Sequence, residues 1–234
     1  MKRPIVTLNA AMSLDGRIAT AIERDSTLSS REDWIRVHEM RAKSDAIMVG
    51  AGTIRIDNPT LKVKREILSS NNEIHNPIRV IPSSRGDIDP KARVITVEPE
   101  IPTIIAVSSQ APDSHVLKLK KMGVEVITCG SEKMVNLKLL MMKLYERGVR
   151  TLMLEGGATL NWSMLHNKLI DNISIAIAPV ICGGIGAVSL FEGKGYPKMT
   201  DSPLIDLNST EKAGDCLVLK YKVNYNQKRL VNIH

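Results

Sequence analysis

The stretch from residue 151 to residue 165 constrains the possible fold of this chain most. Residues 151–154 form a short apolar run that predicts a buried strand, and Leu160, Met164 and Leu165 recur at helical spacing. Two glycines, Gly156 and Gly157, lie between the two segments. A strand that turns into a helix through glycines exposes backbone N–H groups at a positive helix end, which suits a phosphate. The glycines alone also fit a tight turn with no ligand.

A second glycine turn supports the same interpretation. It covers residues 50–53 and follows the apolar run 46–49. Ligands of open α/β sheets bind beyond the carboxyl ends of the strands, so the two turns could line one crevice. Asp57 lies four residues after Thr53 and shares its helical face. It could accept hydrogen bonds from a ligand, or it could be a solvated acid before Asn58-Pro59.

Apolar runs alternate with helical patterns along most of the chain, which predicts an α/β fold with a largely parallel sheet. We expect one domain over residues 1–222, a polar tail over 223–234, and loops at 62–76 and 179–186. The expected helices cover residues 30–42, 113–122, 134–147 and 159–165. The expected strands cover residues 4–11, 46–49, 77–81, 94–97, 103–107, 124–128, 151–154, 172–178 and 216–221.

Composition narrows the classes of function. The 234 residues carry a formal net charge of +7, which favours anionic partners. Aromatic residues make up only 3% and no nucleic-acid motif is found, so phosphorylated small molecules fit better than nucleic acid. No apolar run reaches the roughly 18–20 residues of a membrane span. The three cysteines, Cys129, Cys182 and Cys216, are far apart, which predicts reduced thiols in the cytoplasm and no metal site.

Four motifs, in this order, resemble the riboflavin-pathway reductases. They are Asn9-x-Ala11-x-Ser13-x-Asp15-Gly16, then His38-x-x-Arg41-Ala42-x-x-Asp45-Ala46-Ile47, then Val49-Gly50-x-Gly52-Thr53-x-x-x-Asp57-x-Pro59-x-Leu61, and Glu155-Gly156-Gly157. The chain is most similar to the stand-alone archaeal and fungal type, which acts on 2,5-diamino-6-ribosylamino-4(3H)-pyrimidinone 5′-phosphate. It also resembles the reductase half of the bacterial bifunctional deaminase–reductase. The likeness extends from about residue 4 to about residue 220.

The resemblance implies a fold and an activity. The fold is the three-layer dihydrofolate reductase-like fold with a central, mostly parallel mixed sheet. The activity is NADPH-dependent reduction of the ribosyl group at C1′ to a ribityl group, by a cytoplasmic homodimer. The chain lacks the zinc signature of a deaminase, so we expect a reductase alone. Three alternatives stay open: a reductase of the deaminated pyrimidine, a dihydrofolate reductase, and a basic module that only binds phosphorylated ligands.

The resemblance also implies a cofactor site. Members of the family usually carry Asp-Ser where this chain has Ser83-Ser84. A neutral Ser83 repels a 2′-phosphate less than an acid would, so Arg85 becomes the candidate for that phosphate, or else an ordinary surface arginine. The implied cofactor contacts are Thr53, Asp57, Ser83, Ser84, Arg85, Ile127, Gly156, Gly157, Ala158 and Thr159.

The implied substrate contacts are Asn9, Ser29, Arg41, Leu61, Lys64 and Glu155. Arg41 and Lys64 are expected to bind the 5′-phosphate, although Arg41 could be a helix-end cation. Glu155 is expected to accept hydrogen bonds from the pyrimidine, or else to cap the Gly-Gly helix. Glu155 and Asp15 are the catalytic candidates, as proton donors, with solvent and the substrate phosphate as alternatives. The apolar run 173–181 could form the dimer surface or an ordinary core strand.

Overall fold

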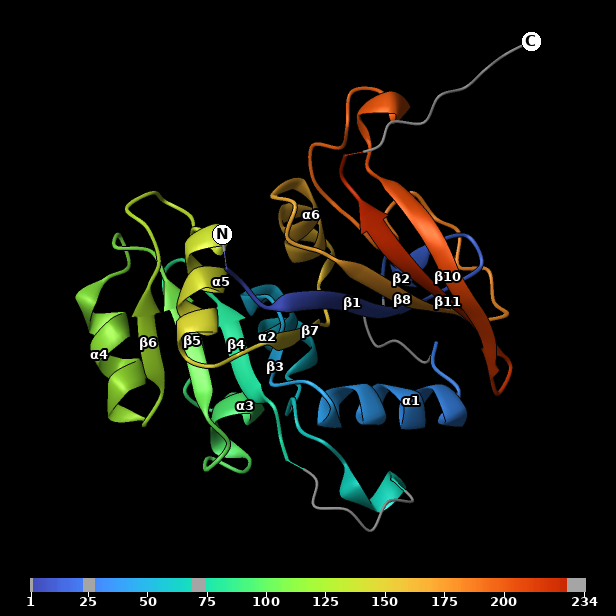
Figure 1. Ribbon diagram of the computed structural model, residues 1–234. Helices are drawn as coiled ribbons and strands as arrows, with labels where there is room; N and C mark the ends of the chain where they lie inside the picture. The colour runs from blue at the N-terminus through green and yellow to red at the C-terminus, as the bar shows by residue number, and fades with distance from the viewer. Residues whose placement is uncertain (1, 23–27, 69–74, 227–234) are drawn as a thin grey trace.

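The structure is a computed structural model that describes residues 2–22, 28–68 and 75–226. Its centre is a nine-stranded sheet in the order β10-β11-β8-β1-β7-β3-β4-β5-β6 (Figure 1). The strands from β8 to β6 in this order are parallel, and β11 and β10 continue the sheet in antiparallel pairs. The bounds are β1 Ile5–Met12, β3 Ala46–Met48, β4 Ile78–Pro82, β5 Thr103–Val107, β6 Glu125–Thr128, β7 Thr151–Leu154, β8 Asn172–Ile177, β10 Leu204–Ala213 and β11 Cys216–Asn224.

Helices cover both faces of the sheet and make three layers. One core joins the strands to α5 and α6 through Leu140, Leu144 and Met164. The core on the other face includes Ile54 of α2 and Leu119 of α4. The helices are α1 Arg31–Ala42, α2 Ala51–Asp57, α3 Arg93–Thr96, α4 Asp113–Lys121, α5 Leu137–Glu146 and α6 Ala158–His166, with short 3-10 turns η1 Arg65–Ile67 and η2 Met199–Asp201. Strands β2 Arg17–Ala19 and β9 Val188–Ser189 form a separate antiparallel pair.

The central strands are continuous apolar runs in the sequence because helices cover both faces of the sheet. In β3, Ala46 and Met48 belong to the first core, and Ile47 belongs to the second. All three are fully buried, because successive side chains point to opposite faces and helices cover both. The start of α1 is also as predicted, since Ser30 accepts a hydrogen bond from the Asp33 N–H.

The predicted strand over residues 94–97 is wrong, because the structure has the helical turn α3 there. The reason is tertiary. Arg79 of β4 is fully buried and donates to the carbonyl oxygens of Val94 at 3.0 Å, Val97 at 3.0 Å and Glu98 at 3.2 Å. Burial lowers the pKa of the Arg79 guanidinium. The carbonyl oxygens at the end of a helical turn accept three hydrogen bonds from this cation. We infer that these bonds override the strand propensity of the local valines and isoleucine.

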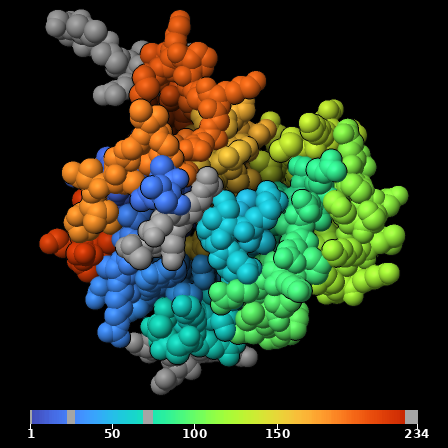
Figure 2. Space-filling model, turned by 180° about the vertical axis from the view of Figure 1, so that it is seen from behind, coloured from blue at the N-terminus to red at the C-terminus, as the bar shows by residue number. Residues whose placement is uncertain are grey.

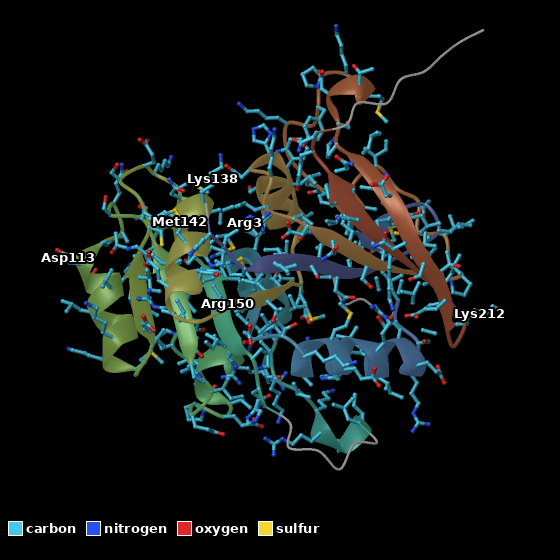
Figure 3. All side chains as sticks on the ribbon, viewed as in Figure 1. Arg3, Asp113, Lys138, Met142, Arg150 and Lys212 are labelled. Atoms are coloured by element: carbon cyan, nitrogen blue, oxygen red, sulfur yellow. The ribbon has the colours of Figure 1, made fainter. Side chains whose placement is uncertain are left out.

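The sequence did not predict β10, although it is the longest strand. Nearly all of its residues are exposed, and its polar run shows no clear alternation of apolar residues. Strand β11 was predicted and extends to Asn224, two residues into the expected tail. Lys212 lies near the tip of this β10–β11 hairpin (Figure 3).

Strand β8 is an ordinary core strand in this chain. It is hydrogen-bonded to β1 on one side and to β11 on the other, and residues 173–176 are buried. It therefore offers no free sheet edge to a second copy. The part of the chain that the structure describes contains no helix long and apolar enough to cross a membrane.

Candidate active site

A cavity of about 370 Å³ opens at the carboxyl ends of β1, β3 and β7. Helix α1, the first turns of α2 and α6, and the β2–β9 pair complete its walls. On the face seen in Figure 2, α2 in cyan lies beside blue residues from the N-terminal part of the chain. The site residues predicted from the sequence that line this cavity are Asn9, Ser29, Arg41, Thr53, Asp57, Glu155, Gly156, Gly157, Ala158 and Thr159.

The two glycine turns meet in this cavity, as predicted. The Gly50 N–H donates to the Gly156 carbonyl at 2.8 Å, which ties the turns together. Helix α6 begins after Gly157 without a side-chain cap, so its first-turn N–H groups face the cavity with no capping side chain. A Cβ on Gly157 would lie 3.2 Å from Thr53 Oγ1. The missing side chain leaves a cradle between α6 and Thr53, and this cradle fits a cofactor phosphate.

Arg41 and Glu155 form an ion pair at the wall of the cavity. Arg41 Nε donates to Glu155 Oε1 at 2.8 Å and Nη2 donates to Oε2 at 2.7 Å. Both side chains are nearly buried, at 10% and 13% exposed. Arg41 Nη1 also donates to the Lys62 carbonyl at 2.9 Å. Glu155 therefore does not cap α6, and Arg41 neutralises Glu155 while each carboxylate oxygen keeps room for one more donor.

Arg36 is a residue at this site that the sequence analysis missed. Its guanidinium donates to Asp33 Oδ1 at 2.8 Å, to Asn9 Oδ1 at 2.9 Å and to Ser174 Oγ at 2.8 Å. Asn9 and Ser174 are register partners on β1 and β8, so α1 holds two strands together through one side chain. The three-residue spacing of Asp33 and Arg36 on a predicted helix was the available signal.

Asp15 lies outside the cavity and is held as a carboxylate. It accepts from Ser13 Oγ at 2.7 Å and from the N–H groups of Cys182 at 2.9 Å and Gly183 at 2.8 Å. These hydrogen bonds, with the Ser13 bond first, hold the pKa of Asp15 well below its usual range. A carboxyl group that stays ionised has no proton to give near neutral pH. Asp15 instead has a structural role, because it links the loop after β8 to the turn after β1.

His38 makes a structural hydrogen bond behind the cavity wall. The ring is buried, and its Nδ1 accepts from the Lys64 N–H at 3.0 Å. Burial, followed by the nearby charges of Arg41 and Lys64, lowers the pKa of His38 to about 4. The ring stacks on Trp34 with centroids 5.9 Å apart, and Trp34 lines the cavity. A neutral His38 thus supports the cavity wall from behind.

The other predicted site residues do not line the cavity: Leu61, Lys64, Ser83, Ser84, Arg85 and Ile127. Leu61 and Ile127 are buried in the two cores. Ser84 Oγ accepts from the Val135 N–H at 3.1 Å, which ties the turn after β4 to the loop after β6. Arg85 is exposed, and among the described residues we find no ion-pair partner for its guanidinium.

Comparisons with known proteins identify the family of the chain. The profile of the family described as RibD C-terminal domain matches residues 4–219. The chain is 43% identical over 221 residues to the 2,5-diamino-6-ribosylamino-4(3H)-pyrimidinone 5′-phosphate reductase of Methanothermobacter thermautotrophicus, covering 94% of this chain and 99% of the relative. An Aquifex aeolicus protein with the same name is 36% identical, covering 95% of this chain and 98% of that protein.

Solved structures agree with the fold. Acinetobacter baumannii RibD superposes with a TM-score of 0.80 at 25% identity, over 95% of this chain and 58% of that one. A pyrimidine reductase-like protein from Corynebacterium diphtheriae shares the fold, with a TM-score of 0.78 at 20% identity over 94% of this chain and 92% of that one. These matches confirm the expected dihydrofolate reductase-like fold. The chain belongs to the RibD C-terminal domain family.

Proposed function

We propose that this protein reduces 2,5-diamino-6-ribosylamino-4(3H)-pyrimidinone 5′-phosphate to its ribitylamino product, with NADPH, in riboflavin biosynthesis. The relatives that carry this name span almost the whole chain. One observation in the structure supports the proposal most: a single cavity joins the Gly156–Gly157 turn to the Arg41–Glu155 pair. The turn suits the phosphates of a nicotinamide coenzyme, and the pair suits a polar ring.

The family of reductases points to a nicotinamide cofactor, and we propose that it is NADPH. The bound coenzyme supplies the hydride, and the protein supplies binding, orientation and a dry pocket. We assign the phosphate cradle to Gly156, Gly157 and Thr53, with Asp57 at its rim. Arg85 is exposed at the end of β4 and offers a guanidinium to a 2′-phosphate.

The reaction needs one hydride at C1′ and one proton on the ribose ring oxygen, whose bond to C1′ breaks. Asp15 does not supply the proton, because hydrogen bonds hold it ionised outside the cavity. Both oxygens of Glu155 already accept hydrogen bonds from Arg41. We therefore assign the proton to solvent or to the substrate phosphate, and we assign orientation of the pyrimidine to Glu155.

The hydrogen-bonding capacity of Glu155 leads us to expect a preference for one of the two pyrimidine substrates. Its free lone pairs accept from the ring N–H and the 2-amino group of the diamino compound. In the deaminated compound a carbonyl replaces that amino group, and a buried mismatch of this kind costs about 1–3 kcal/mol. We expect about tenfold or greater preference for the diamino substrate in kcat/KM.

The test follows NADPH oxidation at the nicotinamide absorbance band with each phosphorylated pyrimidine and with dihydrofolate. Turnover of the diamino compound, with much slower turnover of the others, supports the proposal. Equal rates on the two pyrimidines, or preference for the deaminated one, would assign the chain to the other branch of the family. Fast turnover of dihydrofolate, or no turnover at all, would overturn the proposed function.

We further propose that the protein is a cytoplasmic homodimer whose single reductase domain extends to Asn224 at the end of β11, two residues beyond the expected boundary at 222. Strand β8 does not supply the dimer surface, for the reasons given above. The β10–β11 hairpin carries exposed apolar side chains instead, at Ile205, Leu207 and Leu217. Light scattering at micromolar concentration should give twice the chain mass of 25.8 kDa, and a monomer would contradict the dimer.

A further inference from the structure

The contact between Arg36 and Asn9 determines which way the Asn9 amide points. A guanidinium has five N–H donors and no acceptor, so the Asn9 atom that lies 2.9 Å from Arg36 Nη2 is the carbonyl oxygen. The Asn9 NH₂ group must then lie on the other side. Asn9 lines the cavity, and among the described residues its NH₂ group has no hydrogen-bond partner. Asn9 therefore presents a donor to the cavity.

Arg36 is itself fixed. Its side chain is 11% exposed and pairs with Asp33, whose side chain is 1% exposed. Ser174 accepts from the same guanidinium at 2.8 Å. The Arg36 guanidinium, bound to Asp33 and Ser174, cannot turn away from Asn9 without leaving the buried Asp33 carboxylate unpaired. The orientation of Asn9 is thus set by a buried network and not by the ligand.

Asn9 and Glu155 are neighbours at the edge of the sheet. Strands β1 and β7 are parallel, with Leu8 opposite Leu154 as their last register pair. Asn9 and Glu155 are the next residues on the two strands, and both line the cavity. One donor and one acceptor therefore stand side by side, each with its direction fixed by an arginine of α1.

We propose that Arg36 is a positioning residue that makes Asn9 a hydrogen-bond donor to the ring carbonyl of the pyrimidinone, next to the ring N–H that Glu155 accepts. This inference rests on the proposed function and adds the recognition of one ring edge to it. The name of the relatives' substrate, a 4(3H)-pyrimidinone, places a carbonyl at C4 beside an N–H at N3. That acceptor–donor order complements the donor–acceptor order of Asn9 and Glu155.

The two residues then have separable effects. The diamino pyrimidine and its deaminated form share the C4 carbonyl and the N3–H, and they differ at position 2. Losing the Asn9 donor should weaken both substrates equally, whereas Glu155→Gln should change their ratio. A merely structural role for Asn9 would lower the melting temperature or the NADPH affinity as well.

The first variant is Asn9→Asp, which keeps an oxygen for Arg36 and replaces the N–H donor with an acceptor. We expect KM to rise about tenfold or more for both pyrimidines, with their ratio, the NADPH affinity and the melting temperature unchanged. Calorimetric titration with the ribitylamino phosphate product gives the same comparison without turnover. Wild-type KM and product affinity in this variant would overturn the proposal.

The second pair of variants tests Arg36. Arg36→Lys keeps the charge beside Asp33 and loses the fork that reaches Asn9, so KM should rise several-fold for both pyrimidines. Ser174→Ala removes another contact of Arg36 and leaves Asn9 held, so its KM should stay within about threefold of wild type. Equal KM values in these two variants would show that Arg36 does not act through Asn9. A wild-type protein that turns over neither pyrimidine would instead refute the proposed function, and product affinity would still decide the role of Asn9.

Discussion

Two turns at the same edge of the sheet differ in what they leave for a ligand. After β7, the Gly156–Gly157 turn leads into α6 with no side-chain cap, and the cavity reaches its backbone. After β4, Ser83 N–H donates to the Ala106 carbonyl and Ser84 Oγ accepts from the Val135 N–H, so these two groups of the second turn are already used within the protein. The exposed Arg85 side chain has no ion-pair partner among the described residues. We therefore expect the first turn to bind an anion mainly through its backbone, and the second mainly through the Arg85 side chain.

The largest effect should come from a side chain in the first turn. Gly156 has φ of +92°, and a Cβ there would lie 3.4 Å from the Asn161 side chain. Gly156→Val should weaken cofactor binding by at least about 1,000-fold, which is about 4 kcal/mol. Gly148→Val is the matched control, because Gly148 has φ of +90° and open space around its Cβ position, in the loop before β7.

Fluorescence titration with NADPH measures both variants, and circular dichroism checks their folding. If Gly156→Val binds NADPH as well as Gly148→Val does, the first turn is not the cofactor site. The contrast between the two turns would then have no functional meaning.

Arg41 at the cavity wall and Arg85 in the second turn should differ in how much they stabilise the fold. Arg41→Ala removes the partner of a nearly buried Glu155 and should cost about 3 kcal/mol of unfolding free energy. Arg85→Ala removes an exposed cation that has no ion-pair partner among the described residues, and the free energy of unfolding should stay within about 0.5 kcal/mol of wild type. Urea unfolding decides between them. Equal losses would show that the Arg85 turn is as tightly held as the cavity wall.

The free energy of unfolding should also depend on pH, through His38 behind the cavity wall. The pKa of His38 is lowered from the ordinary value of 6.5 to about 4. Between pH 4 and pH 6.5, the unfolded chain therefore binds a proton that the folded chain does not. Stability is therefore complete above pH 6.5 and falls as the pH drops toward 4. From pH 7.5 to pH 5 the loss should be about 2 kcal/mol. His38→Gln should remove this part of the pH dependence in urea unfolding, and an unchanged profile would show that His38 is not its source.

The smallest effect should be at the second turn. If Arg85 binds the 2′-phosphate, Arg85→Ala should lower the preference for NADPH over NADH about tenfold, or 1.4 kcal/mol, without changing NADH affinity. Because the charge is exposed, salt should reduce the difference between wild type and variant. An unchanged preference would leave Arg85 as a surface cation and would widen the contrast between the two turns.

The sequence predicted the parts of this molecule that depend on neighbours in the chain. The apolar strands, the start of α1 at Ser30 and both glycine turns are local patterns, and the structure contains them. Arg41 and Glu155 are 114 residues apart and Asn9 and Arg36 are 27 apart, so no local pattern shows that they meet. Strand β10 escaped prediction because an exposed edge strand needs no apolar face. The prediction of a strand over residues 94–97 was wrong because an arginine distant in the sequence, Arg79, determines their conformation.

Strand β1 has a consequence for the synthesis of the chain. Its two neighbours are β7 and β8, with Leu8 opposite both Leu154 and Ile173. At about 5–20 residues per second, a ribosome needs roughly 7–30 seconds to make the residues between β1 and β7. During that time the first strand leaves the ribosome as an apolar segment with unpaired backbone edges, which is open to aggregation or to a chaperone. The central strand β1 can therefore pair only after the C-terminal half of the chain, which holds β7 and β8, has been made.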